Sequence, residues 1–180
     1  MDLIAQLDAV DQQARQNFGL LSSEQLNWKQ SPEKWSIAQC LDHLVVSNST
    51  YFPVFDRMIQ GSYQPSLGVR VNPLKKFFGR MGIKTLGPTP TKKFKNPQIF
   101  EPSSSNIPPT IVQQFTHHQD TLKFYFKQLQ NLNTEKIFMA SPVSPIISYS
   151  LKDAMNILAG HEQRHINQAM EVLHHPNFPK

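Results

Sequence analysis

Two histidines near the C-terminal end of the sequence have the spacing of metal ligands. His161 and His165 are the ends of the run His-Glu-Gln-Arg-His. Residues four apart on an α-helix differ by roughly 40° around its axis, so both imidazoles would project from one face, one turn apart. That arrangement suits two ligands of one divalent metal ion. The spacing alone does not separate this interpretation from two core-edge histidines bonded to backbone or water.

Further polar residues are candidates to complete such a site. The two histidines continue the apolar face of a predicted helix, and two buried imidazoles side by side need partners that one metal ion would supply. His43, flanked by apolar residues in an earlier helical stretch, is a candidate third ligand. His118, near the inward register of another stretch, is a candidate fourth ligand or outer partner. Gln168, three residues after His165, is a candidate to orient a ring or a bound water.

The same run also matches H-E-x-x-H, the zinc peptidase signature in which the glutamate is the general base. Glu171 stands ten residues after His161, where one peptidase class has its third ligand. That class breaks the helix after the second histidine, usually at a glycine, whereas residues 167–171 are good helix formers without glycine. We therefore do not predict a peptidase, and we expect Glu162 on a flank of the helix.

The elements that must position these residues are helical. Apolar residues recur at helical spacing over residues 2–21, from Ser31 or Ser36 to about residue 60, and over 109–131 and 150–173. Pro53 predicts a kink in the second helix or a break just before it. No strand alternation is convincing. The pattern predicts an all-α fold, an antiparallel four-helix bundle in a single domain over residues 1–180.

The charge is concentrated between the second and third predicted helices. The chain of 180 residues has a net charge of +5, but residues 61–110 carry +7 and the rest −2. The segment also holds most of the prolines and glycines. We expect a long, mostly irregular crossover insertion at about 61–108, in which Asn72-Pro73 starts a short helix bearing Leu74, Phe77, Phe78 and Met81. Long loops of this kind are often lids or binding segments.

Composition excludes several classes of protein. A hydrophobic content of 39% is too high for a disordered chain, and no apolar run is long enough to span a membrane. The first residues do not resemble a signal peptide, so a cytoplasmic location is expected. Cys40 is the only cysteine, which excludes an intramolecular disulfide and a cysteine-only metal cage.

Three segments together resemble the DinB-like superfamily over nearly the whole chain. They are Trp35-Ser36-Ile37 leading to Leu41-Asp42-His43-Leu44, the crossover segment Lys93-Phe94-Lys95-Asn96-Pro97-Gln98-Ile99-Phe100-Glu101-Pro102, and Gly160-His161-Glu162-Gln163-Arg164-His165-Ile166-Asn167-Gln168. The resemblance implies a four-helix bundle with an unusual crossover and a metal held by three histidines, which by position are His43, His161 and His165. Characterised members include metal-dependent thiol transferases and a thiol-dependent isomerase. The family name does not imply DNA binding.

The leading hypothesis is therefore a metal-dependent enzyme. Three neutral imidazoles leave coordination positions open, as catalytic sites require, and zinc or nickel suits imidazole ligands. We expect a transferase using a low-molecular-weight thiol, or a hydrolase, acting on a small-molecule substrate. If the crossover closes over the metal, Lys92 and Lys93 would favour an anionic substrate. No catalytic residue beyond the ligands is indicated, and Trp35 is expected to be a core anchor.

Two alternatives belong to other classes of protein. One is a scaffold that binds metal without turnover. The other is a module that binds nucleic acid or an anionic surface through Lys75-Lys76-Phe77-Phe78 and Lys92-Lys93-Phe94-Lys95. We favour a solvated loop over nucleic-acid binding there. The aromatic residues of the insertion allow a homodimer, and His117, His174 and His175 are expected to be exposed.

Overall fold

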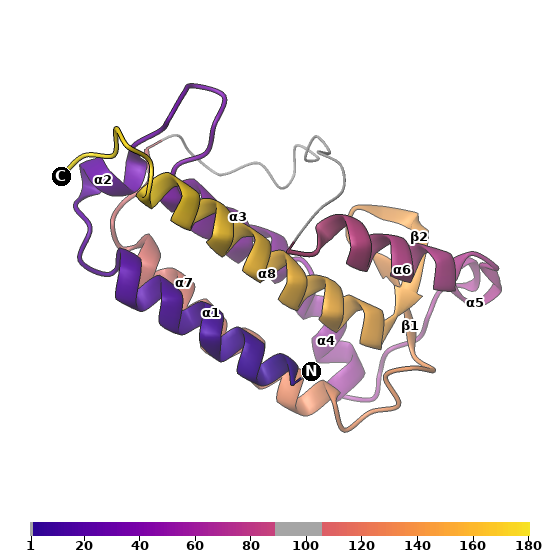
Figure 1. Ribbon diagram of the computed structural model, residues 1–180. Helices are drawn as coiled ribbons and strands as arrows, with labels where there is room; N and C mark the ends of the chain where they lie inside the picture. Colours follow the sequence, from indigo (N-terminus) through magenta and orange to yellow (C-terminus); the bar gives the residue numbers. More distant parts are fainter. Residues whose placement is uncertain (1, 89–105) are drawn as a thin grey trace.

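Four long helices lie side by side through most of the molecule (Figure 1). The computed structural model describes residues 2–88 and 106–180. Among them α1 (Leu3–Phe18) contacts α7 (Ile111–Leu129) and α8 (Leu151–Leu173), and α3 (Ile37–Ser49) contacts the same two helices. The remaining elements are α2 (Ser23–Asn27), α4 (Phe52–Ile59), α5 (Leu67–Val71), α6 (Lys75–Leu86), β1 (Phe138–Ser141) and β2 (Ser144–Ser150). The fold is mostly helical, as predicted.

The helix that carries His43 begins and ends where the sequence indicates. Ser36 accepts a hydrogen bond from the backbone N–H of Gln39, and the Gln39 side chain accepts one from the backbone N–H of Ser36. This capping box fixes the start of α3. Pro53 lies in the first turn of α4, where its missing N–H costs no helical hydrogen bond. The break predicted just before Pro53 is confirmed.

A small antiparallel hairpin corrects the expectation that the chain has no strands. Phe138 pairs with Ser150 and Met139 with Tyr149, and the register slips beyond Ala140. Residues of β1 alternate between half-buried and buried positions, which is the period of a strand with one covered face. The hairpin escaped detection because β1 has only four residues and β2 contains a proline. The all-α assignment therefore becomes a mostly helical fold with a two-stranded sheet.

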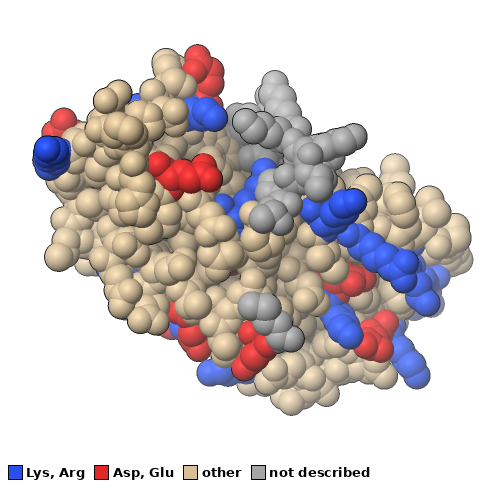
Figure 2. Space-filling view, in the orientation of Figure 1, with Lys and Arg blue, Asp and Glu red and all other residues tan. Residues whose placement is uncertain are grey.

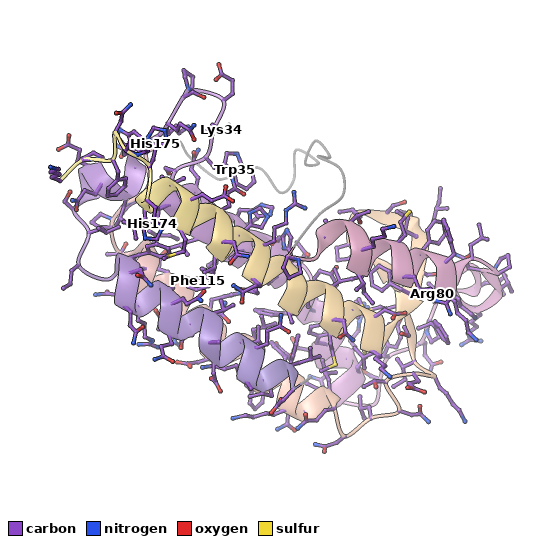
Figure 3. The ribbon with its side chains drawn as sticks, viewed as in Figure 1. Lys34, Trp35, Arg80, Phe115, His174 and His175 are labelled. Atoms are coloured by element: carbon purple, nitrogen blue, oxygen red, sulfur yellow. The ribbon has the colours of Figure 1, made fainter. Side chains whose placement is uncertain are left out.

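The described part of the basic insertion, residues 61–88 and 106–108, contains two helices, α5 and α6, and so holds more helix there than expected. The helix predicted after Asn72-Pro73 is present as α6, and the Asn72 side chain accepts a hydrogen bond from the backbone N–H of Leu74. Figure 2 shows Lys and Arg side chains on this face of the insertion, and Figure 3 labels Arg80, one of the four basic residues of α6. Lys92, Lys93 and the crossover segment 93–102 lie outside the described residues.

Glycines let α6 lie close against α8. A Cβ on Gly79 would overlap the carboxylate of Asp153, and a Cβ on Gly82 would come within 2.6 Å of Cδ1 of Ile157. The two helices therefore pack closely along this face. The close packing brings the end of α6 over the middle of α8, where the candidate ligands stand.

A polar layer lies among α3, α7 and α8, between two apolar clusters. One cluster includes Phe55, Leu122 and Leu158, and the other includes Leu41, Phe115 and Ile166. Between them lie buried polar residues from three helices, namely His43, Asn48, His118, Gln119, Glu162 and His165. Buried polar groups need partners, so this layer is where chemistry is expected. Within the described ranges, no helix is long and apolar enough to cross a membrane.

Candidate metal centre

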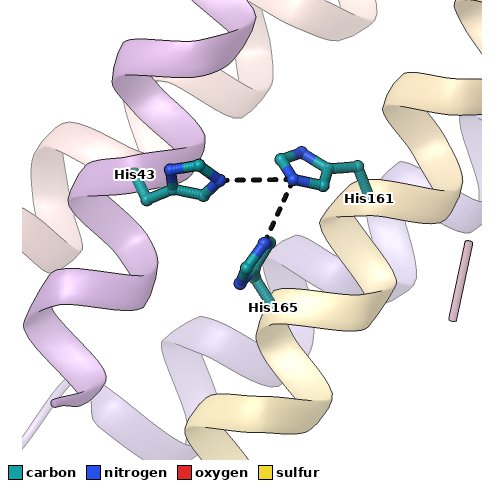
Figure 4. A group of neighbouring side chains, drawn as sticks. All are labelled: His43, His161 and His165. Atoms are coloured by element: carbon teal, nitrogen blue, oxygen red, sulfur yellow. Dashed lines mark hydrogen bonds between the residues drawn. The ribbon is translucent and has the colours of Figure 1, made fainter. Parts of the chain in front are cut away.

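Three imidazoles from two helices converge in the polar layer (Figure 4). His43 comes from α3, and His161 and His165 come from successive turns of α8. Nε2 of His161 lies 3.2 Å from Nε2 of His43 and 3.1 Å from Nε2 of His165. His43 and His165 are buried and His161 is half-buried. Among the described residues, this is the one group of ligand side chains close enough to hold a single ion.

A hydrogen bond outside the cluster sets the tautomer of one ring. Nδ1 of His165 lies 3.0 Å from Oε1 of Gln168, one turn further along α8. A carbonyl oxygen only accepts, so Nδ1 carries the proton and donates. Nε2 of His165 is then left with its lone pair directed at the other two rings, as a metal ligand requires. Gln168 thus occupies the place that the sequence predicted for an outer partner.

The distances between the Nε2 atoms fit ligands of one divalent ion. Metal–nitrogen bonds of about 2.0–2.1 Å place neighbouring donors roughly 3.3 Å apart in a tetrahedron and roughly 3.0 Å apart at right angles. The observed 3.1 and 3.2 Å fall between these values. Without an ion, these contacts need a proton on one of the facing Nε2 atoms, because two lone pairs would otherwise repel each other. The three donors of His43, His161 and His165 are therefore placed so that they could bind one divalent metal ion.

Electrostatics keep these rings in the neutral, ligating form. Burial lowers the pKa of His161 to about 3, with smaller contributions from the charges of His43 and Arg164. Burial also holds the pKa of His165 well below its usual value, and the neighbouring rings act in the same direction. A metal ion therefore does not have to displace protons from these two rings at neutral pH.

Trp35 packs against the apolar cluster that includes Leu41 and Ile166, as expected of a core anchor, and it also forms one wall of the centre. The indole is half-buried and lies just before the capping serine of α3. Its ring centroid is 4.8 Å from that of His43 and 5.5 Å from that of His165, nearly parallel to the latter. An aromatic face against two imidazoles restricts their rotation and limits access of water from that side.

The end of α6 approaches the same turn of α8. Arg164 donates from Nη1 to the backbone oxygen of Thr85 at 3.1 Å. Gly160 faces Gly87, and a Cβ on Gly160 would come 3.2 Å from Cα of Gly87. The half-buried Arg164 guanidinium acts on the pKa of both His161 and His165, so it lies within electrostatic reach of them. The end of α6 therefore borders the centre, and its backbone holds the α8 cation Arg164 beside the two histidines.

Glu162 is fully buried, whereas the sequence placed it on a flank of the helix. Its Oε1 accepts from Nδ2 of Asn48 at 2.5 Å and its Oε2 accepts from Nε2 of Gln119 at 2.7 Å. Burial raises the pKa of this carboxyl to about 8, against the lowering effect of the two hydrogen bonds. Both oxygens are engaged in tying α8 to α3 and α7. Inward amides at Asn48 and Gln119, each within an apolar register, are the sequence signal that would have revealed this network.

The other polar residues lie elsewhere. The His118 ring stacks on Phe52, with centroids 5.2 Å apart, and is not part of the converging group. Glu171 is exposed, and α8 continues unbroken to Leu173, as the helix-forming residues after His165 predicted. His174 is exposed at the end of α8 (Figure 3), but His175 is half-buried and packs against Trp28, contrary to expectation.

The class defined by this fold and site is a mostly helical protein with a three-imidazole candidate metal centre between two long helices. A family model of the DinB superfamily matches residues 6–169. The chain belongs to the DinB superfamily, as the resemblance of its motifs indicated. Searches of curated proteins and of solved structures find no match.

Proposed function

We propose that this protein is a cytoplasmic metal-dependent enzyme, a thiol transferase or hydrolase. His43, His161 and His165 hold a zinc or nickel ion, and α1, α3, α7 and α8 form the family's four-helix bundle, with residues 61–108 as its crossover. The observation that carries the proposal is the convergence of the Nε2 atoms of His43, His161 and His165 at the spacing of ligands to one ion. When bound, the metal would supply Lewis acidity and lower the pKa of a water or thiol.

The residues around the centre support a small anionic substrate or a thiolate cofactor. Arg164 is a half-buried cation beside His161 and His165, anchored by the backbone of Thr85. A fixed positive charge in a partly desolvated site favours an anionic group over a neutral one. Trp35 covers another side of the centre, and its face suits an apolar part of the substrate. The side-chain amides of Asn48 and Gln119 donate hydrogen bonds to the buried Glu162. These bonds hold the part of α8 that carries His161 and His165 against α3 and α7.

Metal analysis of protein purified without a polyhistidine tag tests the site. We expect one metal ion per chain in the natural sequence and loss of that ion in His165→Ala. His174→Ala is the matched control, because His174 is exposed and follows the same helix. Stoichiometric metal in His165→Ala would overturn the ligand assignment.

Turnover separates an enzyme from a metal-binding scaffold. The metal-loaded protein is assayed for loss of glutathione thiol in the presence of 1-chloro-2,4-dinitrobenzene and for hydrolysis of 4-nitrophenyl acetate. Activity that is lost in both His165→Ala and the metal-free protein supports an enzyme. Full metal occupancy without turnover of either probe favours the scaffold. Arg164→Gln should raise KM for anionic probes more than for neutral ones if the guanidinium binds substrate.

A second candidate function rests on the surface of α6. Phe77 is 59% exposed, and α5 and α6 contain no acidic residue while α6 carries four basic ones. This surface suits an anionic partner such as nucleic acid or a lipid headgroup layer. Binding to random-sequence DNA and to vesicles containing phosphatidylserine, compared at low and high salt, tests it. No binding at low salt would exclude it.

A further inference from the structure

A cavity lies at the end of the molecule where α4, α5 and β1 meet. Its volume is about 540 Å³, within the range of small-molecule sites. Its walls come from the end of α4, the loop into α5, the start of α6 and the connection from α7 to β1. None of its lining residues belongs to α3 or α8, which carry the three histidines. The cavity is therefore separate from the candidate metal centre.

The interior of this cavity is apolar, and its walls are fixed by buried side chains and by a hydrogen bond. Met58 and Val69 are 4% and 2% exposed, and Ile137 and Phe138 add half-buried apolar surface. The Tyr63 hydroxyl donates to the backbone oxygen of Phe138 at 3.0 Å, which fixes the tyrosine ring as a wall. A preformed apolar interior binds an aliphatic or aromatic group without first having to order its walls.

The polar groups that line the cavity are cationic. Arg70, Lys75 and Lys136 all contribute to the lining, and no aspartate or glutamate of the described residues does. None of these cations forms an ion pair with a carboxylate among residues 2–88 and 106–180. An apolar interior with three cations and no local counter-charge is complementary to a ligand with an anionic head and an apolar body.

Two of the cations are held in place by neutral contacts. Arg70 donates from Nε to the backbone oxygen of Pro65 at 3.0 Å and from Nη2 to Oε1 of Gln64 at 3.2 Å. Nζ of Lys75 donates to the backbone oxygen of Arg70 at 3.1 Å and lies 4.4 Å from the centre of the Phe138 ring. These contacts position both side chains without neutralising them. Lys136 is exposed at the mouth.

We propose that this cavity is a binding site for a small amphipathic carboxylate, with the apolar tail between Val69 and Phe138 and the carboxylate between Arg70, Lys75 and Lys136. The site takes a free small molecule and operates whether or not the histidine centre holds metal. It is independent of the function proposed above.

Octanoate is the probe for this site, and acetate and octylamine are its matched controls. In a titration of the full chain followed by amide ¹H–¹⁵N correlation spectra, octanoate should give saturable shifts at Val69, Lys136 and Phe138. Acetate lacks the tail and octylamine reverses the charge, so neither should give those shifts. Absence of saturable octanoate binding at millimolar concentration, equal binding of octylamine, or shifts centred on the exposed side of α6 would each overturn the proposal.

Charge removal at the mouth tests the head-group contacts. Lys136→Gln and Arg70→Gln should each weaken octanoate binding by about tenfold, because each removes a charge-assisted contact. Lys136 makes no side-chain hydrogen bond with the described residues, so its replacement leaves the fold intact. Lys127→Gln, in the last turn of α7 and outside the cavity lining, is the control and should not change binding. Unchanged affinity in Lys136→Gln and Arg70→Gln would refute the assignment.

Discussion

The indole of Trp35 lies against the imidazole of His165, with ring centroids 5.5 Å apart and planes 24° from parallel. Trp35 immediately precedes the capping serine of α3, whereas His165 stands in the middle of α8. The contact therefore joins the start of one ligand-bearing helix to the ligand face of the other. Through this contact, the residue before the N-cap of α3 becomes part of the candidate metal centre.

This contact makes Trp35 a reporter of metal binding. The chain has two tryptophans, so Trp35 is the only source of tryptophan fluorescence in Trp28→Phe. We expect Ni²⁺ to quench the fluorescence of Trp28→Phe saturably, because the ion would lie behind the ring of His165. The fluorescence of Trp35→Phe, which retains Trp28 beside His175, should not change. Equal quenching of the two variants would contradict the placement of the ion.

The Gln168 amide is expected to set metal affinity through His165. Gln168→Leu removes the acceptor for Nδ1–H, so the ring loses its fixed tautomer and part of its basicity. We expect zinc affinity, measured by competition with a chromogenic chelator, to fall by about 10–100-fold. Gln168→Glu restores an acceptor and should recover most of the loss. Gln163→Leu is the control, since that amide bonds Asn167 on the same helix. An unchanged zinc affinity in Gln168→Leu would show that Gln168 does not position His165.

Glu162 is expected to stabilise the fold rather than act as a base. Glu162→Leu leaves the amides of Asn48 and Gln119 without their acceptor, which should cost about 2–5 kcal/mol of unfolding free energy. Glu162→Gln keeps the shape, and rotation of one neighbouring amide supplies an oxygen opposite the new NH₂ group. We expect near-natural stability and metal content for Glu162→Gln in denaturant unfolding and metal analysis. Glu171→Leu, at an exposed position of the same helix, should change stability little.

A general base at Glu162 would give a different pattern. Glu162→Gln would then retain the fold and the metal but lose all turnover of the ester probe. The structure favours the first pattern because both carboxylate oxygens already accept hydrogen bonds inside the polar layer.

The sequence predicted the positions of the ligands because helical periodicity fixes which residues share a face. The four-residue spacing places His161 and His165 on one face of α8, whereas His43 was identified from its apolar neighbours and from the resemblance of its motif to the family. The same logic failed for Glu162, which was expected on a flank of the helix but is fully buried. Its burial depends on two amides from helices that are distant in sequence. The hairpin after residue 137 was missed for a related reason, since its strands are stabilised by pairing and by the Tyr51–Tyr149 contact rather than by local pattern.

His118 should make the fold sensitive to acid. Burial, with a smaller contribution from His117, lowers the pKa of this ring to about 4, while the unfolded chain takes up the proton near pH 6.5. The unfolded state therefore binds more protons between these pH values, and the stability contributed by neutral His118 is lost as the pH falls from 6.5 to 4. The free energy of unfolding should fall by about 3 kcal/mol over this pH range.

Replacement of His118 by phenylalanine isolates this contribution. Phenylalanine keeps a ring against Phe52 and needs no partner for Nε2, which has none among the described residues. We expect His118→Phe to match or slightly exceed the natural protein in unfolding free energy at pH 7 and to gain on it steadily down to pH 4. Urea unfolding at a series of pH values measures the difference, with His174→Gln as an exposed-histidine control that should follow the natural protein. Parallel curves for His118→Phe and the natural protein would mean that folding leaves the pKa of His118 unchanged.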